Sequence, residues 1–361
     1  MNSSDEHEFN VLNEEYIKIN IPNIFISVFY FLFGVTGNSC VLLVYCLCVK
    51  RRNNRYYIPF LALVDLLSCL MNSAWEIMFD MQPLNFNDNM GCKWIRFLGN
   101  ALAILSGFLL VVIALQRFML VCKPLRHPSS VKTKNAVLLV TLMLGLAISS
   151  PKFIFTGITE IKTRNQRITG TVCGILDEYS NTTGLLVYDI ILRVIAGLCY
   201  LSITILYIFV VRAIYIRNQK LSQSHKTTAR ILREGSNNNS VDDRVQSSTS
   251  RNSQHEYQGR EQRDSDTSTN LRNRNIIATH RFSIMFFVIT LIILITYAPR
   301  LAIESIEAMD KNFAANFSDV DIALKGFFEN LYILNAVINP MIYGYFDREF
   351  RVILKRKLCG R

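Results

Sequence analysis

Several oxygen-bearing side chains interrupt long apolar segments, and these residues are the best placed in the sequence to do chemistry. Asp65 lies in the middle of one such segment, where a carboxylate is costly and marks a functional position. Asn335, Asn339 and Tyr343 recur at every fourth position of another, so a helix would place them on one face. Their oxygens suit a hard cation. They equally suit a water-filled polar network, and both interpretations stay open.

The segments that must position these groups are long enough to cross a membrane, because about 20 apolar residues of helix span the hydrocarbon core. Half of the 361 residues are hydrophobic and 19% are charged, which argues against a soluble enzyme, a disordered scaffold or a nucleic-acid binder despite the net charge of +11. We therefore predict an all-α membrane protein, a seven-transmembrane helix bundle. Its spans are residues 24–49, 57–80, 95–121, 135–155, 185–215, 282–302 and 326–345.

The segments between the spans alternate in charge. Four carry little or negative net charge, namely 1–23, 80–91, 152–189 and 304–325, and the alternate four are basic, namely 50–55, 117–134, 217–281 and 346–361. Because basic loops stay cytoplasmic, we expect a plasma-membrane protein with an extracellular N-terminus and a cytoplasmic C-terminus. No basic region followed by a short apolar region precedes the first span, so we expect it to act as its own insertion signal. The glycosylation sequons on the outer side begin at Asn2, Asn181 and Asn316.

These boundaries divide the chain into an extracellular segment (1–23), spans 1–5 (24–216), a third cytoplasmic loop (217–275), spans 6 and 7 (276–345) and a C-terminal region (346–361). The loop is rich in Ser, Asn, Gln, Arg and Asp, so we expect it to be disordered. In the C-terminal region, apolar residues at helical spacing alternate with basic ones and predict a short amphipathic eighth helix on the inner leaflet. Cys359 near its end is a candidate for palmitoylation, with an unmodified thiol as the alternative.

Particular motifs then indicate a family. They are Gly37-Asn38, the run from Leu61 to Asp65, Gln116-Arg117-Phe118, Pro299, and Asn339-Pro340-Met341-Ile342-Tyr343. In this order and spacing they resemble the rhodopsin-like (class A) G-protein-coupled receptors. The resemblance implies a receptor that binds an extracellular ligand and activates a heterotrimeric G protein by outward movement of the sixth span. The competing functions are a seven-span transporter or enzyme, and a decoy receptor that does not signal.

An enzyme is disfavoured because all five His residues lie outside the spans and no nucleophile motif, catalytic carboxylate pair or phosphate-binding loop is present. By resemblance, Asp65, Ser106, Asn335 and Asn339 are the candidate ligands of a structural or allosteric sodium ion, and no other cofactor is expected. The same resemblance implies a set of activation-switch residues: Gln116, Arg117, Tyr207, Tyr297, Pro299, Asn339, Pro340 and Tyr343.

Two of these switch positions depart from the family. The residue before Arg117 is normally acidic, but here it is Gln116, which removes the charge-assisted part of its interaction with the arginine. We expect a weaker inactive-state lock and higher basal signalling. Tyr297 stands where the family usually carries tryptophan, whereas Pro299 is kept and should kink the sixth span.

Among the nine cysteines, only Cys92 and Cys173 lie in the predicted outer regions, where thiols are oxidised. They are the available disulfide pair, which would tie the second outer loop to the third span. The alternative is two unpaired thiols.

Acidic residues near the outer ends of the spans favour a cationic ligand. An amine receptor is disfavoured because Gly99 stands where an aspartate is expected, and an opsin because Ile333 replaces the retinal lysine. We expect a peptide ligand that carries arginine or a free amine, in a receptor similar to those for invertebrate neuropeptides. The candidate contacts are Trp75, Glu76, Glu304, Glu329 and Arg193. Alternatively, these acids pair internally with Arg96, Arg193 or Arg300.

The third cytoplasmic loop also carries clusters of Ser and Thr, at 247–250 and 265–269, with Ser253 between them. Phosphate groups there would each add about −1.5 to −2 charge. The loop is therefore the candidate site for receptor kinases and arrestin, with a passive solvated loop as the alternative. Membrane lipid is an expected partner, and nucleic acid is not.

Overall fold

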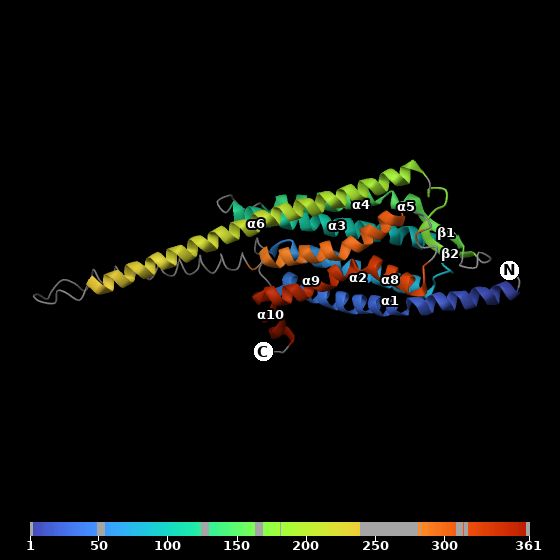
Figure 1. Cartoon of the computed structure of the whole chain (residues 1–361), viewed down its shortest axis with the longest axis horizontal. Coiled ribbons are helices and arrows are strands. Elements are labelled where there is room, and N and C mark those ends of the chain that lie inside the picture. Colours follow the sequence, from blue (N-terminus) through green and yellow to red (C-terminus); the bar gives the residue numbers. More distant parts are fainter. Residues whose placement is uncertain are drawn as a thin grey trace, which may run out of the picture.

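The computed structural model describes residues 3–48, 55–123, 130–162, 169–180, 182–238, 281, 283–307, 313 and 317–358. Helices dominate these residues, and a two-stranded antiparallel sheet is the exception. Most of the long helices run lengthwise side by side (Figure 1). The N-terminus and the sheet lie at one end of this bundle, called here the hairpin end, and the C-terminal helix lies towards the other, called the α10 end.

The first half of the described chain supplies four of the long helices. They are α1 (Ser3–Leu43), followed directly by the π-helix η1 (Val44–Cys48), then α2 (Ile58–Met81), α3 (Asn89–Cys122) and α4 (Val131–Ser149). The short helix α5 (Lys152–Phe155) follows α4. Pro151 separates α4 from α5, because proline has no backbone N–H to donate to the preceding turn. The predicted fourth span, 135–155, therefore consists of two helices.

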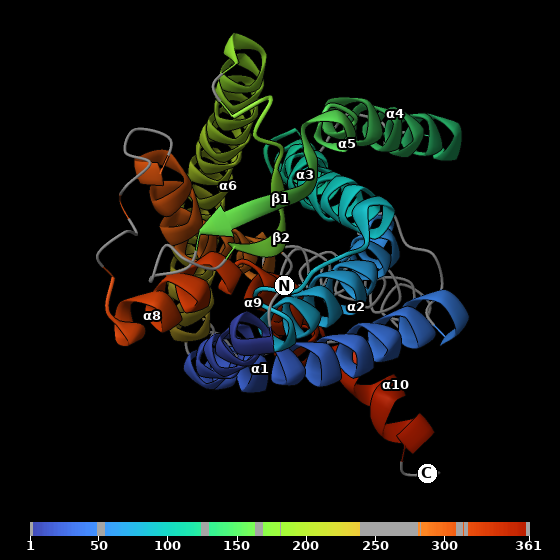
Figure 2. The same ribbon diagram turned by 90° about the vertical axis from the view of Figure 1, so that its right-hand side faces the viewer.

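The second half begins with the hairpin of β1 (Thr156–Lys162) and β2 (Thr169–Ile175), followed by α6 (Thr183–Asn238). The helix Ser283–Glu307 and then α8 (Asp319–Asn330), α9 (Ile333–Phe346) and α10 (Arg348–Leu358) complete the described chain. Seen from the hairpin end, the two strands cross the end of the bundle (Figure 2). This hairpin was not expected from the sequence.

Six of the described helical segments are long and apolar enough to cross a membrane, and they match the first six predicted spans. The seventh span is divided between α8 and α9, which meet at Leu331 and Tyr332. There, Leu334 and Asn335 donate backbone hydrogen bonds to residues three positions earlier, so the helix is tighter than an α-helix. This division explains why no single long helix covers residues 326–345.

The seventh span begins at a capping box. The Ser318 hydroxyl accepts a hydrogen bond from the backbone N–H of Asp321, and the Asp321 carboxylate accepts from the backbone N–H of Ser318. These hydrogen bonds, with one from the Ser318 hydroxyl, lower the pKa of Asp321. A negative charge in the first turn also suits the positive end of the helix dipole.

Many large apolar side chains point away from the bundle. On α4, Leu139, Val140 and Met143 are each more than half exposed, and on α6 the same holds for Leu198 and Ile208. An apolar surface of this kind is the one that hydrocarbon covers in a membrane-spanning bundle. The buried apolar core lies between the helices and includes Leu61, Leu109, Ile113, Phe286 and Ile289.

Two parts of the predicted organisation differ from the structure. Residues 217–238, expected to begin a disordered loop, instead continue α6 as one helix to Asn238. The reason is that 217–234 contain no Pro or Gly and are rich in Lys, Arg, Gln and Leu, all of which favour helix. Likewise, most of the predicted N-terminal segment belongs to α1. The remainder of the predicted loop, 239–275, lies outside the described residues.

The predicted amphipathic helix is present as α10, and it begins at Arg348. Asp347 is its N-cap, because its carboxylate accepts hydrogen bonds from the backbone N–H groups of Glu349 and Phe350. The same carboxylate pairs with Arg55 at 3.0 Å and accepts from the hydroxyl of Tyr45. This cluster fixes the start of α10 against η1, which contains Tyr45, and against the segment before α2, which contains Arg55.

Candidate functional site

The buried centre of the bundle contains the polar residues singled out from the sequence. Asn339 on α9 donates a hydrogen bond from its side-chain nitrogen to the carboxylate of Asp65 on α2, at 2.7 Å. Both residues are only 1% exposed. Ser106 on α3 and Asn335 on α9 are also buried. Three helices therefore contribute to this set of residues, called here the central polar site.

Three oxygens of the central polar site accept or donate no hydrogen bond among the described residues. They are the Ser106 hydroxyl and the side-chain carbonyl oxygens of Asn335 and Asn339. Buried polar atoms normally have partners, so oxygens of this kind indicate a place for a bound ion or ordered water. One carboxylate with neutral oxygens is a donor set that fits a sodium ion, and no His, Cys, Asp and Glu cluster that could hold a metal is found in the described residues.

The helix α1 approaches α9 closely beside this site. Asn38 donates hydrogen bonds to the backbone oxygens of Gly34 and Ala336, at 2.9 and 3.0 Å. A Cβ atom at Gly37 would lie 2.9 Å from the ring of Pro340, so only glycine fits. The motif residues Gly37 and Asn38 thus position α9, which carries Asn335 and Asn339.

Three of the predicted switch residues, Arg117, Tyr207 and Tyr343, lie towards the α10 end. Arg117 on α3 is 1% exposed, and its guanidinium carbon lies 4.9 Å from the ring centre of Phe286 on the helix Ser283–Glu307. Tyr207 on α6 and Tyr343 on α9 are buried within electrostatic range of Arg117. Tyr343 is also within range of Asp65. From Asp65 through Tyr343 to Arg117, buried polar groups therefore lie within electrostatic range of one another, and this row is called here the buried polar path.

The other switch positions lie around this path. Gln116, beside Arg117, is half-buried. Tyr297 packs against Tyr332 with ring centres 5.5 Å apart and lies within electrostatic range of Asp65. Pro299 lies two residues further along the same helix. Tyr297 therefore connects the central polar site to the charged residues at the hairpin end.

At the hairpin end, two of the predicted ligand contacts already have partners. Glu304 pairs with Arg300 at 2.9 Å, and Glu329 pairs with Lys325 at 3.1 Å. Lys325 also pairs with Glu307 at 2.9 Å. Glu304 is therefore paired with Arg300, one of the internal partners expected from the sequence, whereas Glu329 is paired with Lys325, which was not among them.

The third acid at this end, Glu76, makes no ion pair within 4 Å among the described residues. It interacts with the side chain of Asn330 and lies within electrostatic range of Arg96 and Arg300. Asn330 was not singled out from the sequence, because a lone Asn near the end of a span carries no pattern of its own.

Arg193 and Trp75, the predicted basic and aromatic ligand contacts, also lie at this end of the bundle. Arg193 on α6 donates to the backbone oxygen of Glu304, at 3.5 Å, and so joins α6 to the helix Ser283–Glu307. Trp75 is 5% exposed and packs edge-on against Phe79 and Phe86.

The disulfide between Cys92 and Cys173 is formed, with the two Cα atoms 5.5 Å apart, which confirms the predicted pair. It ties β2 to the first turn of α3. Arg96, one turn further, donates to the backbone oxygen of Cys173 at 3.0 Å. Thr171 of β2 exchanges backbone hydrogen bonds with Leu84 and Phe86 in the segment between α2 and α3. The hairpin is thus fixed to the bundle by both covalent and hydrogen bonds.

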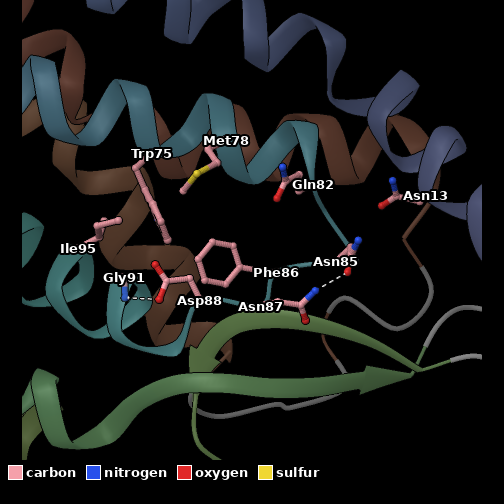
Figure 3. Close-up of a pocket in the computed structure, with 10 residues that line it drawn as sticks. All are labelled: Asn13, Trp75, Met78, Gln82, Asn85, Phe86, Asn87, Asp88, Gly91 and Ile95. Atoms are coloured by element: carbon pink, nitrogen blue, oxygen red, sulfur yellow. Dashed lines mark hydrogen bonds between the residues drawn. The ribbon is translucent and has the colours of Figure 1, made fainter.

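A cavity of about 690 Å³ opens beside the disulfide, between α1, the end of α2 and the start of α3 (Figure 3). Of the sequence-predicted site residues that the structure describes, Trp75 alone lines it. Asn2, Asn181, Asn316 and Cys359, the predicted modification sites, lie outside the described residues.

Comparison with known proteins agrees with this architecture. Residues 37–343 match the model of the 7 transmembrane receptor (rhodopsin family). Similar proteins include the mesotocin receptor of Rhinella marina, 23% identical over 150 residues (41% of this chain, 38% of the relative). The C5a anaphylatoxin chemotactic receptor 1 of Danio rerio is 31% identical over 150 residues, 40% of each chain. The substance-K receptor of Mus musculus is 25% identical over 129 residues (36% of this chain, 34% of the relative).

The aligned regions span about two-fifths or less of these relatives' own lengths, whereas the family model covers most of the described bundle. Together with the helix bundle and the disulfide, that match excludes the seven-span enzyme considered above. The chain belongs to the rhodopsin family of seven-transmembrane receptors, which are signalling proteins and not enzymes.

Proposed function

We propose that this receptor binds an extracellular peptide and activates a heterotrimeric G protein. The relatives support a peptide, since they are named as receptors for mesotocin, C5a anaphylatoxin and substance K. The observation that carries the proposal is the buried polar path from Asp65 through Tyr343 to Arg117. Ionisable and polar groups inside a membrane are costly, and a path that leads from the centre of the bundle to its α10 end suits the transmission of a ligand's effect.

The hairpin end faces the extracellular solution in this proposal, and the α10 end faces the cytoplasm of a cell with the receptor in its plasma membrane. The basic loops between the spans support that orientation. α10 then lies on the inner leaflet, with Cys359 beyond it available for palmitoylation. Asn2, Asn181 and Asn316 are then available for glycosylation.

Activation follows from the contacts of Arg117. In the structure its guanidinium packs on Phe286, which belongs to the sixth span. When the sixth span moves outward about its kink at Pro299, that contact breaks and Arg117 becomes available to the G protein. Tyr207 and Tyr343, both within electrostatic range of Arg117, then become its partners. Gln116 lacks the charge to hold Arg117 strongly in the inactive state.

A sodium ion at the central polar site would stabilise one arrangement of this path. Asp65, Ser106, Asn335 and Asn339 would hold it, because they supply one negative charge and three neutral oxygens without protein partners among the described residues. An ion bound there would favour the conformation that keeps α2, α3 and α9 together.

The ligand contacts are Trp75, Glu76, Glu304, Glu329 and Arg193 in this proposal. A cationic ligand group meets no competing ion pair within 4 Å at Glu76 among the described residues. At Glu304 and Glu329 the ligand must compete with Arg300 and Lys325. Arg193 offers a place for an acidic group or the carboxyl terminus of the peptide.

Beyond the described residues, the third cytoplasmic loop carries the clusters at 247–250 and 265–269. We propose that receptor kinases phosphorylate them and that arrestin binds the phosphorylated loop. Deleting residues 236–270 would then slow agonist-driven internalisation and leave nucleotide exchange intact. Unchanged internalisation would reject this role for the loop.

The test of the main proposal uses cells that carry this receptor with calcium and cyclic-nucleotide reporters, exposed to a library of synthetic neuropeptides. Peptides that give a response are then tested with the purified receptor and G protein for stimulated guanine-nucleotide exchange. Peptide-stimulated exchange supports the proposal. Peptide binding without exchange would instead support a decoy receptor.

A further inference from the structure

The cavity beside the disulfide differs chemically from the charged residues around Glu76 and from the central polar site. It lies between the N-terminal part of α1, the last turns of α2, the segment 82–88 and the first turns of α3 (Figure 3). Its volume, about 690 Å³, is in the range of cavities that bind small molecules or a few residues of a peptide. Among the described residues, no lysine or arginine lines it.

One side of this cavity is apolar. Trp75 and Phe86 pack against each other with ring centres 5.2 Å apart, and Met78 lies beside them on α2 (Figure 3). The two rings are almost completely buried, whereas Met78 is about one-third exposed. An apolar side chain that enters the cavity can therefore pack on Met78 and on the edges of the two rings, as the geometry of aromatic contacts favours.

The other side is lined by neutral amides. Asn13 of α1 accepts a hydrogen bond from the backbone N–H of Leu84, and Gln82 at the end of α2 is exposed. Asn85 and Asn87 follow in the loop. Side-chain amides offer both donors and acceptors, which match the N–H and C=O groups of a peptide backbone.

Two further observations limit the chemical groups that this cavity can bind. The indole N–H of Trp75 is buried and has no hydrogen-bond partner among the described residues, so an acceptor such as a carbonyl oxygen is what it lacks. Asp88 is the one charged residue in that part of the lining which the structure describes, and its carboxylate already accepts a hydrogen bond from the N–H of Gly91 as the cap of α3. With no cation in the lining, an anionic group would meet only negative charge.

We propose that this cavity is a second subsite of the receptor and binds a neutral segment of the peptide ligand that carries an aromatic side chain. The aromatic ring packs on Met78, Trp75 and Phe86, and the flanking backbone amides bind the side chains of Asn13 and Gln82. This inference rests on the proposed peptide-receptor function. It adds a selectivity for aromatic residues that the charged contacts around Glu76 do not supply.

The test uses disulfide exchange with the full-length receptor in lipid nanodiscs. In the variant Gln82→Cys, a thiol is placed at the mouth of the cavity. The probes are cysteamine mixed disulfides that carry phenylalanine amide, alanine amide or glutamate amide, in a buffer with 2-mercaptoethanol. The extent of labelling at position 82, read by peptide mass, gives the relative affinity of the three side chains.

We expect the 2-mercaptoethanol concentration that halves labelling to be roughly tenfold higher for the phenylalanine probe than for the alanine probe. The reason is that burial of an aromatic ring raises the affinity of the bound probe by about tenfold or more. The glutamate probe should label least. In the matched control Met81→Cys, whose parent side chain is exposed and does not line the cavity, the three probes should label alike. In Gln82→Cys, adding Met78→Trp fills the cavity and should remove the preference, whereas adding Met81→Trp should keep it.

Equal labelling by the three probes at Gln82→Cys, or a preference for phenylalanine that survives Met78→Trp, would overturn the subsite. An intact Cys92–Cys173 disulfide and an unchanged unfolding temperature in each variant establish that the variants fold. The two proposals fail separately. Unselective labelling together with peptide-stimulated nucleotide exchange rejects the subsite alone, and selective labelling without exchange by any peptide rejects the signalling function alone.

Discussion

Asn339 donates a hydrogen bond to Asp65 across 2.7 Å, and this bond joins α9 to α2 at a point where both side chains are buried. The bond uses only the nitrogen of the amide, so the Asn339 carbonyl oxygen remains for another ligand. Since Ser106 and Asn335 also present oxygens without partners in the described part of the chain, one cation could satisfy the whole set.

Sodium bound there stabilises the folded receptor by an amount that grows with the logarithm of the sodium concentration once that concentration exceeds the dissociation constant. At ten times the dissociation constant, the gain in the free energy of unfolding is about 1.4 kcal/mol. Thermal unfolding in sodium chloride against choline chloride of equal ionic strength measures it. The variant Asp65→Asn should lose the difference between the two salts, because the negative charge is gone. An undiminished sodium effect in Asp65→Asn would mean that the ion binds elsewhere.

The second prediction concerns Gln116. Replacing it by aspartate restores a charge-assisted interaction with Arg117, which is stronger than a neutral hydrogen bond by about 1 kcal/mol. Basal guanine-nucleotide exchange should therefore fall about fivefold in Gln116→Asp. The neutral variant Gln116→Asn is the matched control and should keep high basal exchange. If ligand-free nucleotide exchange does not drop in the aspartate variant, the weak interaction between Gln116 and Arg117 is not a cause of basal signalling.

The third prediction ranks the acids at the hairpin end. For a basic peptide agonist, Glu76→Gln should raise the effective concentration by roughly tenfold or more, since Glu76 has no ion pair within 4 Å among the described residues. Charge reversal at Glu304 or Glu329, made separately, should raise it less, because Arg300 and Lys325 already neutralise these two side chains. Glu160→Gln, an exposed position on β1, is the control. Unchanged potency in Glu76→Gln, Glu304→Lys and Glu329→Lys would reject all three contacts.

The fourth prediction concerns the start of α10. Asp347 is 1% exposed, pairs with Arg55 and caps α10, so Asp347→Ala leaves the guanidinium without its buried carboxylate. Breaking a buried pair in this way costs about 3–5 kcal/mol. Hydrogen exchange across residues 348–358 should speed up markedly in this variant. Glu349→Ala also loses a partner of Arg55, but Glu349 is half exposed, so it should change exchange far less. Equal exchange in the two variants would contradict this account.

The spans and the disulfide could be predicted from sequence because each depends on a strong local property. Apolar runs of about 20 residues indicate membrane-spanning helices. The charge of the loops assigns Cys92 and Cys173 to the outer side, where thiols are oxidised, and so leaves them as the available disulfide pair. The pairing of Glu304 with Arg300, and of Glu329 with Lys325, was visible as a four-residue spacing, but that spacing alone does not decide between internal and ligand partners.

Other features depend on contacts between distant parts of the chain. The β1–β2 hairpin is stabilised by Thr171 bonding to the segment after α2, about 85 residues earlier, and no local pattern indicates it. The cavity beside the disulfide likewise needs α1, α2 and α3 together. By contrast, the extension of α6 to Asn238 could have been predicted, since residues 217–234 favour helix and contain no breaker.

The hydrogen bond from Asn38 to the carbonyl oxygen of Ala336 joins residues that are 298 positions apart. A ribosome that adds about 5–20 residues per second needs about 15–60 s to travel between them. For that time the newly made first helix sits in the lipid with its amide unsatisfied by Ala336. The contact between α1 and α9 therefore forms only after the last span has been made, and in a chain that stops before Ala336 the Asn38 amide would keep only its hydrogen bond to Gly34.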